Sequence, residues 1–255
     1  MHIFNGNPYK TRLHEAWIHT SATAFGQAPP LRFLIFAQGR TGTWLMTHFL
    51  NAHPAIYCEK EILMYAKRAP LCYMGARSRR SHGKVYGCHV QINQLLTAQH
   101  REPQRFLAQA SAQGWRILYM TRRDIVRQSI STILATRRRQ WYAYDRQTVD
   151  MQPQTIAWTE LEPWLQRRID HAHLEKAALQ QLSHLSITYE DDLQDTSHHQ
   201  ATMDRVFAYL DLPTVLVTAQ TERLSRDDLR DTVANYEELI AHVGRSPFAS
   251  YTDLC

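Results

Sequence analysis

The sequence has no long hydrophobic run and few cysteines. The apolar run Phe33–Ala37 is far shorter than the ~20 residues that a membrane helix needs. The amino-terminal residues show no basic segment followed by a hydrophobic core, so no signal peptide is visible. The four cysteines, Cys58, Cys72, Cys88 and Cys255, form no CxxC pair, which argues against a disulfide scaffold or a zinc knuckle. We therefore expect reduced thiols in a cytoplasmic protein without a transmembrane segment.

Positive charge is in moderate excess and is unevenly distributed. The 255 residues include 29 Lys+Arg and 24 Asp+Glu, which gives a formal net charge of +5. With 44% hydrophobic and 21% charged residues, the composition is that of a globular protein, and the length suffices for a single domain over 1–255. The arginines cluster at three places: Arg77 with Arg79 and Arg80, Arg122 with Arg123, and Arg137–Arg139. Such clusters can bind phosphate or sulfate groups, although a solvated helix face explains the third, and no motif indicates a nucleic-acid partner.

Four apolar runs of strand length alternate with helical patterns. Strands are expected at Leu31–Ala37, Lys84–Val90, Trp115–Thr121 and Leu185–Tyr189. Helical spacing is found at residues 44–51, 126–137, 160–182 and 229–243, and Ser225 with Asp228 forms a capping box before the last of these. The alternation predicts an α/β fold with a P-loop-like three-layer architecture, in which helices flank a central parallel sheet. Residues 1–30 show no clear period and end in two prolines, so we expect an extended surface segment there.

The sharpest local motif is Gln38–Trp44, which reads QGRTGTW between the first strand and the next helix. Glycines at this place let the backbone turn tightly, and the N–H groups at the helix start can cradle an anion. A nucleoside-triphosphate P-loop would carry a lysine, whereas the long cation of this loop is Arg40. The motif therefore predicts a site for a phosphate-like group, with a plain glycine turn as the alternative.

A second motif follows the third predicted strand. Asp124 is placed to cap the next helix, and Ser131 lies two helical turns later, on the side from which Arg123 reaches. A guanidinium and a hydroxyl that meet there would suit a phosphate monoester. The alternative is a salt bridge beside a serine that faces its own helix.

These motifs resemble those of the sulfotransferases that use 3′-phosphoadenylyl sulfate (PAPS). The family loop commonly reads P-[KR]-[ST]-G-T-T, and this sequence keeps the cation, glycine and threonine at Arg40, Gly42 and Thr43, with Gly39 where proline is usual. Further elements follow in the family's order: Arg123 with Ser131, Tyr189–Leu193 (like Y-E-D-L with one extra acidic residue), Val206–Leu212 and Asn235–Leu239. The resemblance is greatest to the bacterial nodulation-factor and carbohydrate type.

The resemblance implies a role for most of these residues. Those that would hold the 5′-phosphosulfate are Arg40, Thr41, Gly42, Thr43 and Trp44, with Arg40 also offsetting charge on the leaving oxygen. Arg123 and Ser131 would hold the 3′-phosphate, and Tyr189 would lie near the adenine. No metal is required in this scheme, because these cations and dipoles stabilise the leaving group.

Two residues are candidates for the general base that the acceptor hydroxyl needs. Glu61 corresponds to the catalytic glutamate of the bacterial carbohydrate type, with Glu59 as a nearby alternative. His89 ends the second predicted strand, where cytosolic relatives carry a catalytic histidine, but Gly87 stands where those relatives usually show lysine. We favour Glu61.

The expected activity is sulfuryl transfer from PAPS to a hydroxyl of a carbohydrate, a glycolipid or another small acceptor. The alternatives are a P-loop-type small-molecule kinase and a noncatalytic nucleotide-binding module. The paired histidines His171/His173 and His198/His199 have no third ligand at metal spacing. The aromatic residues that could line an acceptor cleft or belong to the core are Trp141, Tyr142, Tyr144, Trp158 and Trp164, with core favoured for Trp164.

Overall fold

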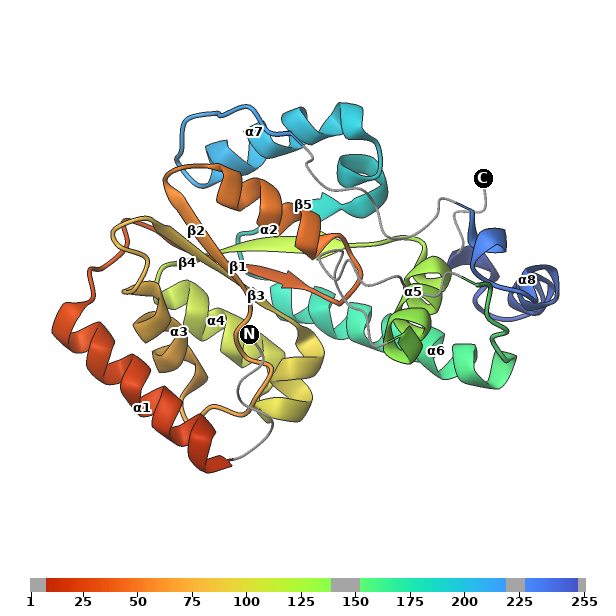
Figure 1. Ribbon diagram of the computed structural model, residues 1–255, viewed down its shortest axis with the longest axis horizontal. Helices are drawn as coiled ribbons and strands as arrows, with labels where there is room; N and C mark the ends of the chain where they lie inside the picture. The colour runs from red at the N-terminus through yellow and green to blue at the C-terminus, as the bar shows by residue number, and fades with distance from the viewer. Residues whose placement is uncertain (1–7, 139–151, 219–227, 252–255) are drawn as a thin grey trace.

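The centre of the molecule is a parallel five-stranded sheet with the order β2-β3-β1-β4-β5 (Figure 1). The structure is a computed structural model that describes residues 8–138, 152–218 and 228–251. The strands are β1 (Arg32–Ala37), β2 (Ile56–Glu61), β3 (Val85–Val90), β4 (Trp115–Thr121) and β5 (Leu185–Thr188). The α-helices are α1 (Pro8–Phe25), α2 (Thr43–Ala52), α3 (Pro70–Ser78), α4 (Pro103–Ala112), α5 (Ile125–Arg138), α6 (Trp158–Leu179), α7 (His199–Tyr209) and α8 (Tyr236–Gly244).

Helices cover both faces of this sheet (Figure 1). On one face, Phe33 and Ile35 of β1 pack in a core with residues of α2 and α7. On the other face, Leu34 and Phe36 pack in a core with residues of α1, α3, α4 and α6. Because β1 is buried on both faces, its sequence is a continuous apolar run, as the sequence analysis predicted. The predicted α/β architecture is confirmed.

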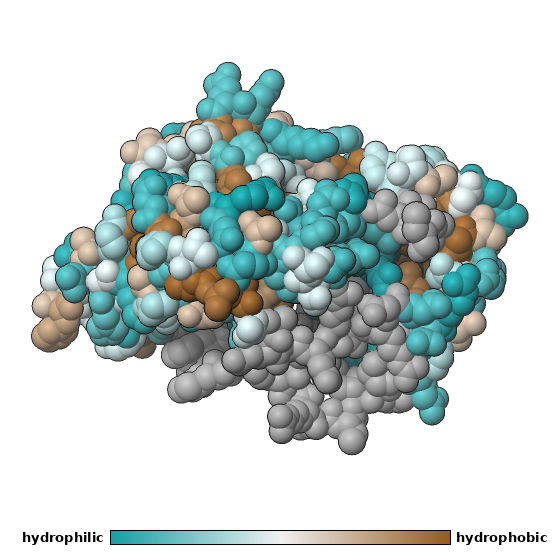
Figure 2. Space-filling model, turned by 90° about the horizontal axis from the view of Figure 1, so that it is seen from above, coloured by the Kyte–Doolittle hydropathy of each residue, from teal (hydrophilic) through white to brown (hydrophobic). Residues whose placement is uncertain are grey.

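A third apolar cluster lies beside the sheet, where α5, α6 and α8 meet (Figure 1). It includes Ile130, Leu165 and Leu239, with Trp158 and Trp164 packed against it, so Trp164 belongs to the core as expected. Hydrophilic side chains cover much of the face seen in Figure 2, with smaller hydrophobic areas between them.

Two expectations about the ends of the chain are wrong. Residues 8–25 form helix α1 rather than an extended segment, because Ile18 and Ala22 bury one stripe of the helix in the core beside α3. The single helix expected over 229–243 is a 3₁₀ turn at Leu229–Asp231 and then α8. The chain breaks between them because Thr232 and Ala234 bond to the backbone of Gln154.

Polar side chains lie at the starts of the 3₁₀ turn and of α8. Asp228 accepts from the N–H of Arg230 and so caps the 3₁₀ turn, whereas Ser225, its expected partner, lies outside the described residues. Asn235 precedes α8 and exchanges two hydrogen bonds with the backbone of Ile156. These bonds fix where α8 begins relative to the sheet.

Candidate active site

The chemistry-bearing residues gather at the carboxyl edge of the sheet. The loop after β1, the residues after β4 and the π-helical turn Tyr189–Leu193 after β5 form one half of this edge. The ends of β2 and β3 form the other half. The carboxyl ends of parallel strands all lie at the same edge of the sheet, and ligands of open α/β sheets bind at that edge.

The loop after β1 has a tightly turned backbone. Arg40 and Gly42 have φ angles of 70° and 84°, in the left-handed region that favours glycine. A Cβ on Gly42 would lie 2.8 Å from Cδ2 of Tyr189, so only glycine fits beneath that ring. Gly42 is the N-cap of α2, and no side chain caps the helix there. The first N–H groups of α2 therefore suit an anion.

Side chains from α5 and from the loop itself hold this turn in place. Thr41 is buried, and its hydroxyl donates to the carbonyl of Gln38 over 2.9 Å. Gln128 Nε2 donates to the carbonyl of Gly39 over 2.8 Å, and Arg40 Nε donates to Ser131 Oγ over 2.9 Å. The structure thus places Ser131 against Arg40, and the Thr41 hydroxyl is bonded within the loop. Further along, Trp44 stacks with His48 on α2.

Arg122 lies beside the loop, although the sequence analysis named it only as part of an arginine cluster. Its guanidinium lies 4.4 Å from the centre of the Tyr189 ring and donates to the carbonyl of Arg40 over 3.1 Å. Its Nε lies 3.6 Å from Glu190 Oε1 and is buried without a hydrogen-bond partner. Burial lowers the pKa of Arg122. A buried, incompletely bonded guanidinium beside the loop fits an anionic ligand.

Arg123 points to a different partner from the one expected. Its guanidinium bonds to Asp191 Oδ2 over 2.5 Å, and its backbone N–H donates to Glu190. The hydrogen bond from Arg123 lowers the pKa of Asp191. Half of the Arg123 side chain is exposed, so it lies at the rim of the edge, whereas Arg122 is buried.

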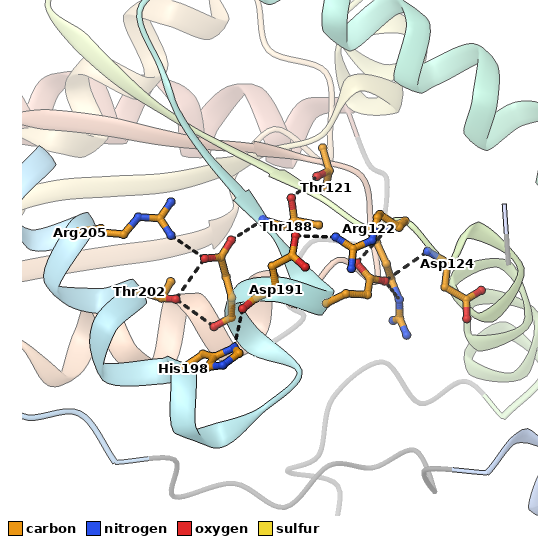
Figure 3. Close-up of polar contacts among 11 residues, drawn as sticks. Thr121, Arg122, Asp124, Thr188, Asp191, His198, Thr202 and Arg205 are labelled. Carbon is orange, nitrogen blue, oxygen red and sulfur yellow. Dashed lines mark hydrogen bonds and ion pairs between the residues drawn. The ribbon is translucent and has the colours of Figure 1, made fainter. Parts of the chain in front are cut away.

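The acidic turn Tyr189–Leu193 is tied to its surroundings by each of its carboxylates (Figure 3). Glu190 accepts from the backbone after β4, and Asp192 accepts from the N–H of Thr188 and from Arg205. The turn therefore joins β4, β5 and α7, with Tyr189 held over the loop. Asp124 caps α5 as predicted, by accepting from the N–H of Arg127 over 2.7 Å.

The other half of the edge brings the two candidate bases together. His89 Nδ1 lies 3.7 Å from Glu61 Oε1. His89 Nε2 contacts the carbonyl of Ala37 at 3.3 Å, and because a carbonyl only accepts, Nε2 carries the proton of the neutral ring. Burial lowers the pKa of His89. The His89 side chain is 4% exposed and that of Glu61 is 21% exposed, so Glu61 has the better access to an incoming molecule.

A register shift in β2 decides which glutamate reaches this place. Glu59 pairs with Cys88 and Glu61 with His89, so one extra residue, Lys60, lies between two successive pairs. Glu59 is bound instead by Arg77 and the hydroxyl of Tyr86. Glu59 therefore has a structural partner, and the structure does not bring it to His89.

The space beside Gly87 is filled by an aromatic ring. A Cβ on Gly87 would lie 2.1 Å from Cζ of Phe33, so no larger residue fits while Phe33 is there. Gly87, which departs from the lysine that the resemblance led us to expect, is thus part of the core in this protein.

A buried polar network supports the loop from below. Gln38 Nε2 donates to Glu175 Oε2 over 3.3 Å, and Arg168 donates to Gln38 Oε1 over 3.2 Å and to Thr132 over 2.7 Å. Tyr119 also donates to Glu175. Burial raises the pKa of Glu175 to about 7 and lowers that of Arg168 to about 10. No local motif marks these residues, because they meet only through the fold.

Other features of the structure lie apart from this edge. A cavity of about 430 Å³ is lined by Tyr57, Glu59, Arg77, Arg80, Ser81, His82 and Lys84, none of which belongs to the site. His198 and His199 bond to the carbonyls of Asp191 and Leu193, and the described residues include no group of three side chains placed to hold a metal ion. Trp141, Tyr142 and Tyr144 lie outside the described residues. None of the helices that can be described is long and apolar enough to cross a membrane.

Comparisons of sequence find bacterial relatives over nearly the whole chain. The chain is 25% identical to Nodulation protein H of Rhizobium tropici over 243 residues, which is 88% of this chain and 94% of the relative. It is 27% identical to Nodulation protein H of Rhizobium meliloti over 248 residues, which is 89% of this chain and 96% of the relative. No family model matches the chain.

Comparisons of structure find sulfotransferases. A sulfotransferase from Alicyclobacillus acidocaldarius matches with a TM-score of 0.52 and 19% identity, over 88% of this chain and 93% of that chain. A mouse sulfotransferase complexed with PAP matches with a TM-score of 0.51 and 14% identity, over 91% of this chain and 90% of that chain. Together these findings confirm the resemblance to PAPS-dependent sulfotransferases and the fold that it implied.

Proposed function

We propose that this protein is a sulfotransferase that moves a sulfuryl group from PAPS to a hydroxyl of a carbohydrate, a glycolipid or another small acceptor. The observation that carries the proposal is the meeting of an anion-binding loop with a carboxylate and an imidazole at one sheet edge. The Nodulation protein H relatives support a bacterial carbohydrate type of acceptor. We also propose that the chain works as a single cytoplasmic domain.

The residues around the loop fit the donor PAPS. The loop residues Arg40 and Thr41 and the uncapped start of α2, with Gly42, Thr43 and Trp44, would hold the 5′-phosphosulfate. Arg122, whose Nε is buried without a hydrogen-bond partner, would add positive charge beside this group. Arg122 stacks on Tyr189, the residue that the resemblance assigns to the adenine, and this contact supports one continuous donor site.

Arg123 and Ser131 are proposed for the 3′-phosphate. Arg123 lies at the rim and pairs with Asp191, from which a phosphate would draw it. Ser131 accepts a hydrogen bond from Arg40, which links it to the loop. We therefore propose that Arg123 makes the charge contact with the 3′-phosphate and that Ser131 bridges the two phosphate sites.

Glu61 is the proposed general base. Its carboxylate takes the proton of the acceptor hydroxyl while the acceptor oxygen forms a bond to sulfur and the bond from sulfur to the phosphate oxygen breaks. The leaving 3′-phosphoadenosine 5′-phosphate (PAP) takes the electron pair, and Arg40 with the helix start offsets the charge. His89 is buried with one ring nitrogen bonded to Ala37, so it is placed to support Glu61 rather than replace it.

Calorimetric titration with PAP tests the donor site. We expect binding that depends on the 3′-phosphate, so AMP, ADP and Mg-ATP should bind more weakly than PAP. A preference for Mg-ATP would indicate a kinase. Equal binding of PAP and AMP would show that the protein does not recognise the 3′-phosphate. A lack of binding of any nucleotide would contradict the proposal.

A further inference from the structure

Two glutamine amides hold the carboxylate of Glu61. Gln91 Nε2 donates to Glu61 Oε1 over 2.6 Å, and Gln94 Nε2 donates to Oε2 over 3.1 Å. The N–H of Gln91 donates to Gln94 Oε1 over 3.2 Å, so the two glutamines and the carboxylate form one closed network. Both glutamines belong to the segment that directly follows β3.

Gln91 also reaches the loop on the other half of the edge. Its Oε1 and Nε2 lie 3.5 and 3.7 Å from the point where a Cβ on Gly39 would be. Gly39 precedes Arg40, and its carbonyl is held by Gln128 of α5. One side chain therefore contacts Glu61 and lies beside the loop at Gly39.

The chemistry of these donors differs from that around Glu59. Glu59 is held by the guanidinium of Arg77, which adds a positive charge beside its carboxylate. Glu61 is held by neutral amides, which orient a carboxylate without adding a positive charge. The charged or titratable groups that face Glu61 are Lys60 on its own strand and His89 on β3.

We propose that Gln91 is a positioning residue for sulfuryl transfer, which holds the Glu61 carboxylate in the orientation that faces a sulfuryl group bound at the loop after β1. The inference rests on the function proposed above. Glu61 ends an edge strand at a register shift and has several rotatable bonds, so backbone geometry alone does not fix its carboxylate. The amide of Gln91 supplies that restraint by its hydrogen bond to Glu61, from a position beside the loop.

The first test is Gln91→Leu in the full chain, assayed by the release of PAP from PAPS with water as the acceptor. We expect the rate constant to fall at least tenfold while the Kd for PAP changes by less than twofold. Gln109→Leu, which removes an exposed amide from α4, is the matched control and should change neither value. An unchanged rate, or an equal loss of rate and PAP affinity, would overturn the inference.

The second test is Gln91→Glu, which keeps the shape of the side chain and decides the question if Gln91→Leu does not fold. Two carboxylates at hydrogen-bond distance share a proton, so the acid limb of the pH–rate profile should move to higher pH by one unit or more. A profile that coincides with that of the wild type would contradict the inference. If the wild type itself binds no PAP, the proposed function fails instead, and the two failures are thereby distinguished.

Discussion

The two halves of the sheet edge are built from opposite chemistry. At the ends of β1, β4 and β5, three arginines meet a carbonyl, a hydroxyl, an aromatic ring and the carboxylates of the acidic turn. At the ends of β2 and β3, a carboxylate and a neutral imidazole are held by amides and a carbonyl. The first half suits a ligand that brings negative charge, and the second suits a group that gives up a proton. Sulfuryl transfer needs both in one place.

A second contrast lies within β2. Glu59 and Glu61 are two residues apart, yet the register shift gives one a guanidinium partner and the other the site. One extra residue in a strand thus gives two identical side chains different surroundings, and the proposed catalytic role falls to Glu61 alone. Substitution of each can separate the two roles.

The largest effect is expected from Glu61→Gln. Loss of a general base lowers turnover by about 10²–10⁴-fold, while the affinity for PAP should stay near that of the wild type. Turnover measured with PAPS, beside calorimetry with PAP, tests both statements. Glu59→Gln is the matched control and should cost roughly 1–3 kcal/mol of unfolding free energy with little change in turnover. If the two variants lose turnover equally, the contrast within β2 is wrong.

Glu175→Gln tests the support beneath the loop. The folded protein keeps Glu175 protonated up to a pKa of about 7, against an ordinary value of 4.5, so the unfolded chain ionises first as pH rises. Glu175 makes its full contribution to the free energy of unfolding below pH 4.5. This contribution is lost as the pH rises through 7, by roughly 3 kcal/mol in total. Glutamine does not titrate, so the free energy of unfolding of the variant should rise relative to that of the wild type between pH 4.5 and 7.5. Urea unfolding at several pH values measures this, and a pH-independent difference would contradict it.

Arg123→Ala tests the rim of the arginine half. It should weaken PAP binding by about 1.5–3 kcal/mol, the size of a charged hydrogen bond, and leave AMP binding almost unchanged. Asp191→Asn should act in the opposite direction, because it removes the carboxylate that holds Arg123. Calorimetry with both nucleotides checks the pair. Equal losses for PAP and AMP in Arg123→Ala would show that Arg123 does not read the 3′-phosphate.

The sequence predicts those parts of the fold that local patterns describe. β1, β3 and β4 are buried on both faces of the sheet, so their sequences are apolar runs that can be recognised locally. The loop after β1 can be recognised from its two glycines. β2 was missed because an edge strand with the sequence IYCEKE is only partly buried. α1 was missed because the stripe that it buries is narrow.

The parts of the site that could not be predicted depend on contacts between distant segments. The choice between Arg122 and Arg123 depends on which of two adjacent side chains turns inward after β4. The meeting of Glu61 with His89 depends on a register shift that no sequence pattern shows. The network of Gln38, Arg168 and Glu175 joins residues more than a hundred positions apart.

The place of β2 in the sheet has a consequence for how such a protein can change. β2 is one of the two edge strands and pairs with β3 alone, whereas β1, which leads into the glycine loop, lies in the middle. Substitutions and insertions around β2 therefore disturb one ladder of hydrogen bonds and leave the pairing of β1 with β3 and β4 intact. Changes at this edge would therefore alter the side proposed for the acceptor and spare the side proposed for the donor.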